Sequence, residues 1–339
     1  MESSAAVVFV EPSNMSPSKK TVIDILRSQS DYVSGQEISE QLGVSRNAVH
    51  KHVNSLRKRG YRIMGVSRRG YRLEEEPCRL SMPLVAKLTQ RSYFGAAFRY
   101  HSELQSTNTE AKKLAVGGAP EGTVVLSESQ SAGRGRLGRQ WTSPAGRGLL
   151  FSMLMRPRLA VSQAHLLTLV TAVAVAEAIE AQARVPVHLK WPNDLIVDNR
   201  KAGGILLEIA GEHDGLDWVV AGVGINVNTE YAELPAVLRS TATSLKIATG
   251  KTVDRSLLLA RTLLTVEREY FQCLEHGFEQ ALRSFRERDY LLHRSVSVET
   301  RDGAVVGEAV GIDERGALLV QLPDRHTRRF HSGDVTLNK

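Results

Sequence analysis

Residues 131–141, SAGRGRLGRQW, combine three glycines and three arginines with no acidic residue. Glycine lets the backbone approach a ligand closely, and an arginine guanidinium binds a carboxylate or a phosphate through two parallel hydrogen bonds. This composition predicts a loop that holds an anionic ligand with Arg134, Arg136 and Arg139. The alternative that stays open is a mobile surface loop without function.

Gly133, Gly135 and Gly138 match the pattern G-x-G-x-x-G, which is typical of dinucleotide-binding loops. In such a loop the glycines open a helix whose N-terminus holds the pyrophosphate. Here residues 144–148 are rich in proline and glycine, and they predict a further loop before a strand at 149–155. A Walker A loop and the triplets of a protein kinase are also missing. The match to the dinucleotide pattern is therefore accidental.

Polar residues also follow two predicted apolar strands elsewhere in the sequence. Lys190 follows a strand-like run, and a lysine is rarely buried there unless it is paired. Binding of an anion is one explanation, and capping of carbonyl groups at the strand end is the other. The strand predicted at 218–226 ends in Gly222, Gly224 and Asn226. We expect the glycines to let a flat ligand come close and the amide of Asn226 to suit an adenine edge.

The positive charge of the chain is concentrated in residues 46–72, which contain nine Lys or Arg and no Asp or Glu. This segment more than accounts for the net charge of +7. A short helix is predicted at 21–27, and a capping box at Ser34 starts a second helix. Gly43 permits a tight turn, and Ser45 can cap a third helix. This spacing is typical of a helix-turn-helix.

Strand-like runs at 61–66 and 71–73 follow the third helix and predict a hairpin wing with a basic tip. Polar side chains on the exposed helix face would meet base edges, and the wing arginines would hold phosphates or the minor groove. The alternative is a small helical domain with a solvated basic face. The predicted DNA-binding residues are Ser45, Arg46, Asn47, His50, Lys51, Asn54, Arg68 and Arg69.

Composition and turn residues divide the chain into four parts. We expect a flexible N-terminus at 1–19, a winged helix-turn-helix domain at 20–77, a large central domain at 78–292 and a small C-terminal domain at 293–339. The central part has an α+β pattern, with a mixed or antiparallel sheet covered by helices. Its predicted elements are a helix capped by Thr107, a strand at 123–127, a long buried helix at 162–181, and strands at 185–190, 195–197, 202–209 and 218–226.

The composition also bears on the compartment. No run of 18 apolar residues predicts a membrane span, and the early AVVFV stretch lacks the basic region of a signal peptide. Cys78 and Cys273 do not make a disulfide framework. We therefore expect a cytoplasmic protein that does not contact a membrane.

Several of these motifs together resemble those of the biotin protein ligase family. The winged helix makes the chain similar to the bifunctional members of that family, the biotin operon repressors. The glycine-spaced apolar alternation of residues 295–337 resembles the SH3-like barrel that closes these enzymes, and their core is class II synthetase-like. The motifs that carry the resemblance are Ser106–Asn108, GRGRLGRQW at 133–141, KWPND at 190–194, KAGGILLE at 201–208 and GVGIN at 222–226.

The resemblance implies an activity and its partners. The protein would join biotin to ATP with Mg²⁺, giving biotinyl-5′-adenylate, and transfer biotin to a lysine of a carboxyl carrier domain of acetyl-CoA carboxylase. It would also bind operator DNA as a homodimer when the adenylate is bound, and repress genes of biotin synthesis or transport. No protein-held metal is implied.

The resemblance also implies roles for individual residues. The catalytic residues would be Arg134, Arg136 and Lys190. The biotin site would comprise Ser106, Thr107, Asn108, Gln130, Arg134, Gly135, Arg136, Trp141, Lys190 and Gly204. The ATP and adenylate site would comprise Arg136, Lys190, Asn193, Gly222, Gly224 and Asn226.

Leu137 departs from the repressor pattern, which has arginine at this place, but the remaining motif is intact and activity is expected. Two alternatives stay open. A lipoate-type acyl ligase would share the core, although the spacing of the two main motifs argues against it. A biotin-sensing regulator without ligase activity is the other, and the intact Arg134, Arg136 and Lys190 argue against that.

Overall fold

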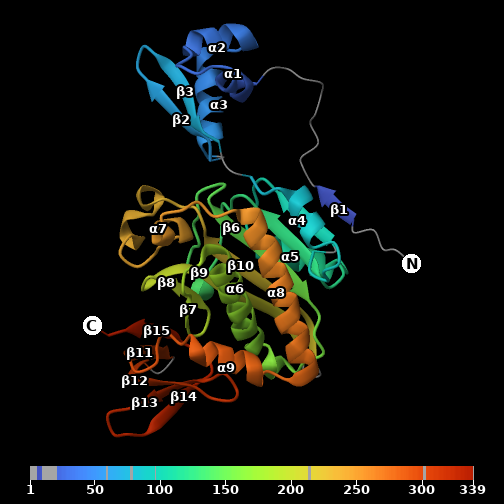
Figure 1. The fold of residues 1–339 in the computed structure, drawn as a ribbon, viewed down its shortest axis with the longest axis vertical. Helices are drawn as coiled ribbons and strands as arrows, with labels where there is room; N and C mark the ends of the chain where they lie inside the picture. The colour runs from blue at the N-terminus through green and yellow to red at the C-terminus, as the bar shows by residue number, and fades with distance from the viewer. Residues whose placement is uncertain are drawn as a thin grey trace.

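The computed structural model shows a helical N-terminal domain, a large central domain and a small C-terminal sheet (Figure 1). In the described part of the chain, the strands form sheets of eight, five and two strands. The expected α+β class is therefore confirmed. The structure describes residues 6–9, 21–58, 60–76, 79–95, 97–212, 215–300 and 303–338.

The N-terminal domain is a winged helix-turn-helix, as predicted. Ile25, Ile38, Val49 and Val53 from its three helices form one buried cluster. Gly43 takes a φ of 65° in the turn between the second and third helices. The elements are α1 (Val22–Arg27), α2 (Gly35–Leu42), α3 (Arg46–Lys58), and the hairpin strands β2 (Arg62–Val66) and β3 (Gly70–Glu75).

The central sheet is mixed, with the strand order β1-β4-β5-β6-β10-β9-β8-β7. The first three strands in this order run parallel to each other, and the remaining neighbours pair antiparallel. The strands are β1 (Ala6–Phe9), β4 (Ala97–His101), β5 (Thr123–Ser127), β6 (Gly148–Met155), β7 (His188–Lys190), β8 (Asp194–Val197), β9 (Arg200–Glu212) and β10 (Gly215–Asn226).

Strand β1 corrects part of the prediction of a flexible N-terminus. Its backbone pairs with β4 at the edge of the sheet, from Ala6 opposite Ala97 to Phe9 opposite Tyr100. The apolar, β-branched composition of this stretch favours a strand where an open edge is available. The other residues of 1–19 lie outside the described part of the chain.

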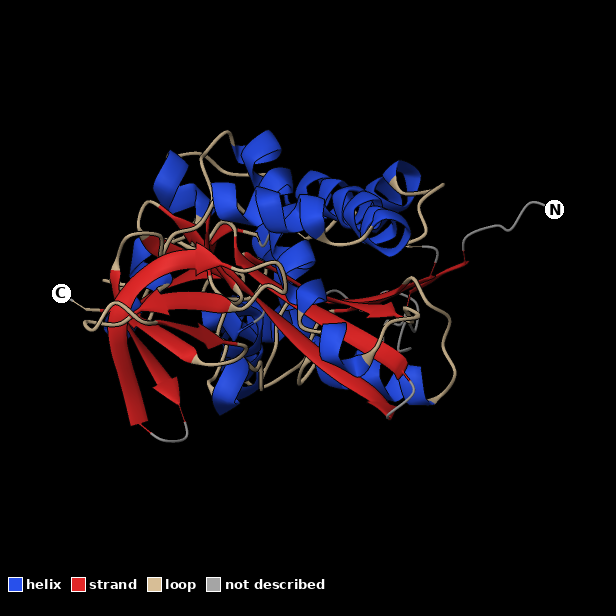
Figure 2. Cartoon of the chain, turned by 90° about the horizontal axis from the view of Figure 1, so that it is seen from below, coloured by secondary structure: helices blue, strands red, loops and turns tan. Residues whose placement is uncertain are grey.

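Helices cover both faces of this sheet (Figure 2). Side chains alternate along β5, so Val124 and Leu126 join the large core with α6 and α8, while Val125 packs with Ala111 and Ala115 of α5. Ser106, rather than the expected Thr107, caps α5. The helices are α4 (Met82–Leu88), α5 (Thr107–Val116), α6 (Leu166–Ala183), α7 (Leu245–Thr249), α8 (Arg255–His276) and α9 (Glu279–Glu287).

The predicted buried helix is confirmed in α6, although it begins at Leu166 rather than near 162. The segment Val161–Ala183 is long and apolar enough to cross a membrane by length and composition alone. However, 72% of its most apolar window is buried inside the fold, which is the pattern of a core helix.

The C-terminal domain is an antiparallel sheet with the order β14-β13-β12-β11-β15. It contacts the central domain where the indole nitrogen of Trp191 donates to the carbonyl oxygen of Gly316 at 3.0 Å. Closure of this sheet into an SH3-like barrel stays a prediction. The strands are β11 (Ser295–Thr300), β12 (Gly303–Ile312), β13 (Leu318–Gln321), β14 (Thr327–Phe330) and β15 (Asp334–Leu337).

Candidate functional site

A cavity of about 570 Å³ brings the predicted ligand-binding residues together. It lies beside the glycine–arginine loop and the strands β8, β9 and β10, and residues of β15 close one side. Every residue predicted for biotin or ATP lines it: Ser106, Thr107, Asn108, Gln130, Arg134, Gly135, Arg136, Trp141, Lys190, Asn193, Gly204, Gly222, Gly224 and Asn226. Segments that are far apart in the sequence therefore form one site, while the role of each residue stays a prediction.

The glycine–arginine loop is closed by its own backbone. The amide of Gly135 donates to the carbonyl of Arg139 at 2.7 Å. The amide of Trp141 donates to the carbonyl of Gly133 at 2.9 Å. A Cβ atom at position 133 would lie 2.5 Å from the Trp141 carbonyl, so only glycine fits there. As expected, no α-helix follows the glycines, only a 3₁₀ turn at Arg136–Gly138.

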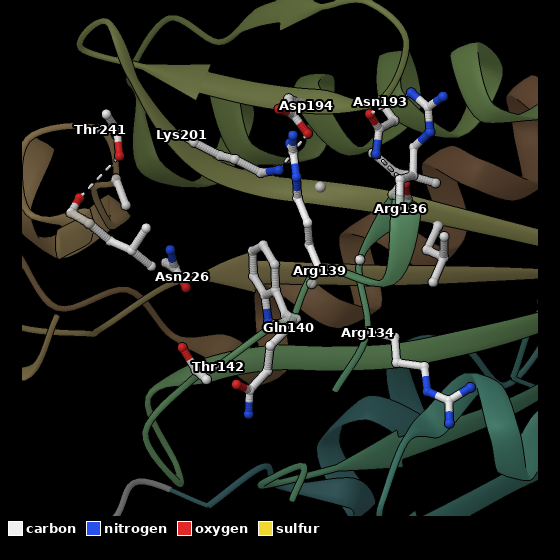
Figure 3. Close-up of a pocket in the computed structure, with 18 of the residues that line it drawn as sticks. Arg134, Arg136, Arg139, Gln140, Thr142, Asn193, Asp194, Lys201, Asn226 and Thr241 are labelled. Carbon is white, nitrogen blue, oxygen red and sulfur yellow. Dashed lines mark hydrogen bonds and ion pairs between the residues drawn. The ribbon is translucent and has the colours of Figure 1, made fainter. Parts of the chain in front are cut away.

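The three arginines of this loop do not converge on one point. Arg136 is half-buried, its Nη1 lies 3.5 Å from Asn193 Oδ1, and burial lowers the pKa of its guanidinium. Arg139 pairs with Asp334 of β15, with Nη1 3.2 Å from Oδ1. Figure 3 shows the guanidinium of Arg134 directed away from Lys201. The expected clamp of Arg134 and Arg136 is therefore not assembled in this structure.

Two lysines face the middle of the cavity, and sequence reasoning identified only one. Lys190 ends β7 opposite Asp194, and burial lowers the pKa of its ammonium group. Lys201 begins the KAGGILLE motif, and its Nζ lies 2.6 Å from Asp194 Oδ1 and 5.9 Å from the centre of the Trp141 ring. Its place before three small residues, Ala202, Gly203 and Gly204, in the motif was the signal that could have identified it.

A buried polar network forms the end of the cavity next to α5. The Thr107 amide donates to Gln130 Oε1 at 2.7 Å. Asn108 donates through Nδ2 to Glu208 Oε2 at 2.8 Å, and its Oδ1 accepts from Ser152 at 2.6 Å. The side chain of Asn108 is thus occupied by protein groups, which favours a supporting position over the predicted direct contact with a ligand. Ser152 and Glu208 were not predicted.

Gly222 and Gly224 of β10 make room for protein side chains, and the expected close approach of a ligand to them stays a prediction. A Cβ atom at Gly222 would lie 2.0 Å from Asn108 Oδ1. One at Gly224 would lie 2.8 Å from the indole of Trp141. Both glycines therefore make room for side chains of the site, and both also line the cavity.

The other end of the cavity is built around Trp141 and Asn226. Asn226 Nδ2 donates to the carbonyl of Thr243 at 3.1 Å, which fixes the orientation of the amide. The segment before Thr243 adds an apolar wall that was not predicted. Two backbone hydrogen bonds connect this segment to β9. The amide of Lys201 donates to the carbonyl of Thr241 at 2.8 Å, and the amide of Thr243 donates to the carbonyl of Lys201 at 2.9 Å. The wall residues are Leu234, Pro235, Leu238 and Ala242.

Helix α3 presents most of the predicted DNA-binding residues on its outer face. Arg46, Asn47 and Lys51 are exposed. His50 and Asn54 also make internal contacts, since His50 Nδ1 lies 3.1 Å from the Tyr71 hydroxyl and Nε2 lies 3.0 Å from Asn54 Nδ2. Ser45 accepts from the amide of Ala48 at 3.2 Å, so it caps the helix as predicted.

The basic tip of the wing is not free of acidic neighbours. Arg68 is exposed with a φ of 65°. Arg69 lies 3.3 Å from Asp31 and 4.5 Å from the ring centre of Tyr32, in the loop between α1 and α2. The fold thus places Asp31 beside a segment that has no acidic residue of its own. Arg68, which has no such ion pair among the described residues, is the arginine more available to DNA.

The chain combines a winged helix-turn-helix with a sheet domain in which lysines and arginines line one cavity. This combination defines a class of DNA-binding proteins that have a second, anion-binding site. Models of three domains match this chain: the biotin/lipoate A/B protein ligase family at residues 101–226, a helix-turn-helix domain at 19–72, and the biotin protein ligase C-terminal domain at 292–337.

Known proteins match the chain along most of its length. The bifunctional ligase/repressor BirA of Bacillus subtilis is 37% identical over 320 residues, covering 94% of this chain and 98% of that protein. The corresponding protein of Escherichia coli is 32% identical, covering 92% and 95%. The structure of the Aquifex aeolicus biotin protein ligase in complex with biotin and ATP matches with a TM-score of 0.62 and 30% identity, covering 71% and 98%. The chain belongs to the family of bifunctional biotin protein ligases and repressors.

Proposed function

We propose that this protein joins biotin to ATP, forming biotinyl-5′-adenylate and pyrophosphate, and then transfers biotin to a carrier-domain lysine. The observation that carries the proposal is the combination of groups that line one cavity. Neutral hydrogen-bonding groups at Thr107 and Gln130, the cations Arg136, Lys190 and Lys201, and the aromatic side chain of Trp141 all belong to its lining. These groups suit a polar ring, an acyl phosphate and a purine.

The cations of the cavity can lower the electrostatic barrier to adenylation, the first step of the proposed reaction. Attack of a carboxylate on the α-phosphoryl group brings two anions together, and fixed positive charges offset their repulsion. Arg136 and Lys190 are both held partly out of water, where their charge acts more strongly than on the surface. Lys201 is held at Asp194 and is the third cation we assign to this role.

Mg²⁺ would fit beside these cations. Among the described residues, no group of three or more His, Cys, Asp or Glu could hold a metal ion by itself. Magnesium in nucleotide sites is commonly held by one or two protein oxygens together with the phosphates, and Asp194 with the amide oxygen of Asn193 supplies such oxygens. When bound there it would neutralise phosphate charge.

The winged helix supports the second half of the proposal. We assign operator DNA to the exposed face of α3, where Arg46 and Lys51 would meet base edges, and to the tip of the wing, where Arg68 would meet phosphate or the minor groove. We also propose the expected carboxyl carrier domain as acceptor, an adenylate-bound homodimer as the repressing form, and a cytoplasmic location. The proposed limits of the domains are 20–77, 78–292 and 293–339.

One experiment tests the catalytic part. The purified protein is incubated with ATP, Mg²⁺, biotin and a biotin carboxyl carrier domain, and biotinylated carrier is measured by mass spectrometry. A parallel reaction with lipoate and a lipoyl domain tests the lipoate-type alternative. We expect modification with biotin only. Biotin binding without pyrophosphate release would support the regulator without ligase activity.

A further inference from the structure

A row of side-chain hydrogen bonds connects helix α3 to both strands of the wing. Arg57 donates to the carbonyl of Ile63 on β2 through Nε at 3.0 Å and Nη2 at 2.8 Å. Its Nη1 donates to Asn54 Oδ1 at 3.2 Å. Asn54 Nδ2 lies 3.0 Å from His50 Nε2, and His50 Nδ1 lies 3.1 Å from the hydroxyl of Tyr71 on β3. The network therefore ends at the Tyr71 hydroxyl, between the helix and the hairpin.

Only one assignment of donors and acceptors satisfies this network. A guanidinium can only donate, so Arg57 holds Asn54 Oδ1 on its own side and Nδ2 faces His50. Because Nδ2 is a donor, His50 Nε2 must accept and carries no proton. The ring proton is then on Nδ1, which donates it to the Tyr71 hydroxyl. Both ring nitrogens of His50 are thus occupied by protein groups, and neither is left for a base edge.

The Tyr71 hydroxyl keeps its own proton to donate. Within the described part of the chain its one hydrogen-bond partner is His50, from which it accepts. The rest of Tyr71 is fixed. Its amide and carbonyl pair with Val33, each at 2.8 Å, and its ring lies where Cβ atoms at Gly65 and Gly35 would come within 3.4 and 3.6 Å. The structure therefore holds a donor in a defined place with no protein acceptor beside it.

The charges around this hydroxyl favour a phosphate oxygen as its acceptor. Arg46 lies one turn before His50 on the same face of α3, is exposed and makes no ion pair with the described residues. Arg68, in the turn that leads into β3, is exposed on the wing side. DNA presents its phosphates to such a surface, and tyrosine hydroxyls are among the groups that bind them.

We propose that the Tyr71 hydroxyl donates to a backbone phosphate of bound DNA, and that His50 positions this hydroxyl instead of reading a base. The inference rests on the proposed DNA-binding function. Since every sequence has the same phosphates, the contact adds affinity without sequence preference. Since Tyr71 is uncharged, it adds affinity without displacing a counterion. These two properties distinguish the contact from base readout by α3 and from an arginine contact of the wing.

The first test measures binding of the full-length protein to a fluorescein-labelled duplex of mixed sequence, by fluorescence anisotropy at several salt concentrations. Tyr71→Phe should weaken binding about fivefold or more, while the slope of log affinity against log salt stays that of the wild type. Tyr61→Phe is the matched control. Its ring belongs to the buried cluster of the same domain, so affinity and slope should stay unchanged. An unchanged affinity or a reduced slope in Tyr71→Phe would overturn the proposal.

A double-mutant cycle tests the role of His50. His50→Ala should weaken binding no more than Tyr71→Phe does, and the double variant should bind like Tyr71→Phe alone, within twofold. His50→Asn, whose amide can donate from the place of Nδ1, should bind like the wild type.

Sequencing of the duplexes bound from a randomised pool measures base preference. His50→Ala should select the same sequences as the wild type. A relaxed preference at one base pair, or multiplying effects in the double variant, would overturn the positioning role. Failure of the wild type to bind any duplex would instead reject the proposed DNA-binding function.

Discussion

Arg147 of the ligase domain donates two hydrogen bonds to the carboxylate of Glu75, the last residue of the wing strand β3. Nη1 lies 2.8 Å from Oε1, and Nη2 lies 3.1 Å from Oε2. Arg147 is 8% exposed, and its Nε also lies 3.3 Å from Glu233. Glu233 immediately precedes the apolar wall of the cavity that begins at Leu234. One arginine therefore joins the DNA-binding hairpin to the segment beside the proposed adenine position.

This contact predicts a pH dependence. The Arg147 hydrogen bond lowers the pKa of Glu75. A carboxyl whose pKa is lower in the folded than in the unfolded state stabilises the fold above its unfolded pKa of about 4.3, and this contribution is lost as the pH falls through the folded value. Glu75→Gln should thus reduce the melting temperature at pH 7, and the difference from wild type should be smaller at pH 3. A constant difference at both pH values would reject this assignment.

Lys190→Ala and Lys201→Ala should each impair adenylation while leaving the fold intact. Removing one preorganised charge from such a site typically costs ~3–4 kcal/mol, or ~10²–10³ in rate. Pyrophosphate release with biotin and ATP measures the effect, and circular dichroism checks the fold. A rate within a few-fold of wild type would show that the substituted lysine is misassigned. An equal reduction of the adenylation rate in both variants would support a role for both lysines at the reacting phosphate.

Arg136→Ala should loosen the adenylate more than free biotin, because this half-buried arginine would meet phosphate as well as carboxylate. Activated biotin would then escape and label lysines on bystander proteins. Arg134→Ala is the matched comparison, and its exposed guanidinium predicts a smaller effect. Mass spectrometry of an added bystander protein measures the leak. Labelling that stays confined to the carrier in Arg136→Ala counts against the assignment.

Deletion of residues 1–77 should abolish DNA binding and leave a folded ligase that lacks only the edge strand β1 of its sheet. The winged helix has its own buried cluster, separate from the core of the ligase domain. For the intact protein, log–log plots of operator affinity against salt should have a slope of about −0.9 per phosphate neutralised. Reversing the charge of Arg46 and Lys51 together should weaken operator binding more than any change in the cavity. Affinity that is insensitive to salt would contradict the proposed DNA face.

Biotin with ATP should promote dimerisation and operator binding. Ordering a glycine-rich loop costs roughly 1–2 kcal/mol per residue, and contacts of the adenylate with Arg136 can supply part of it. A monomer with an ordered loop would dimerise at lower cost, and linkage requires dimer formation to tighten adenylate binding by the same factor, typically ~5–150-fold. Sedimentation with and without biotinyl-adenylate measures this. Equal dimerisation in both would reject the coupling and leave the ligase assignment standing.

Local patterns in the sequence were sufficient to predict many elements of the fold. Caps at Ser34 and Ser45 and the freedom of Gly43 act within a few residues, so the helix-turn-helix was predictable. Apolar and β-branched residues likewise predicted the strand at 123–127. The anion-binding character of residues 131–141 followed from composition, since few other roles suit arginines among glycines. Helices α4, α7, α8 and α9 and strand β4 were not predicted, although Ser244 and Asp254 cap α7 and α8.

Contacts between distant residues were decided only by the tertiary structure. Lys201 meets Asp194 and Trp141 through the register of β8 with β9 and the path of the glycine loop. Glu208 reaches Asn108 because α5 lies against β10, the neighbour of β9, and Gly222 leaves room between them. The acid beside Arg69 likewise comes from another loop. Such pairs depend on how strands align and helices pack, so composition and spacing along the chain identified the chemistry of the site but not its partners.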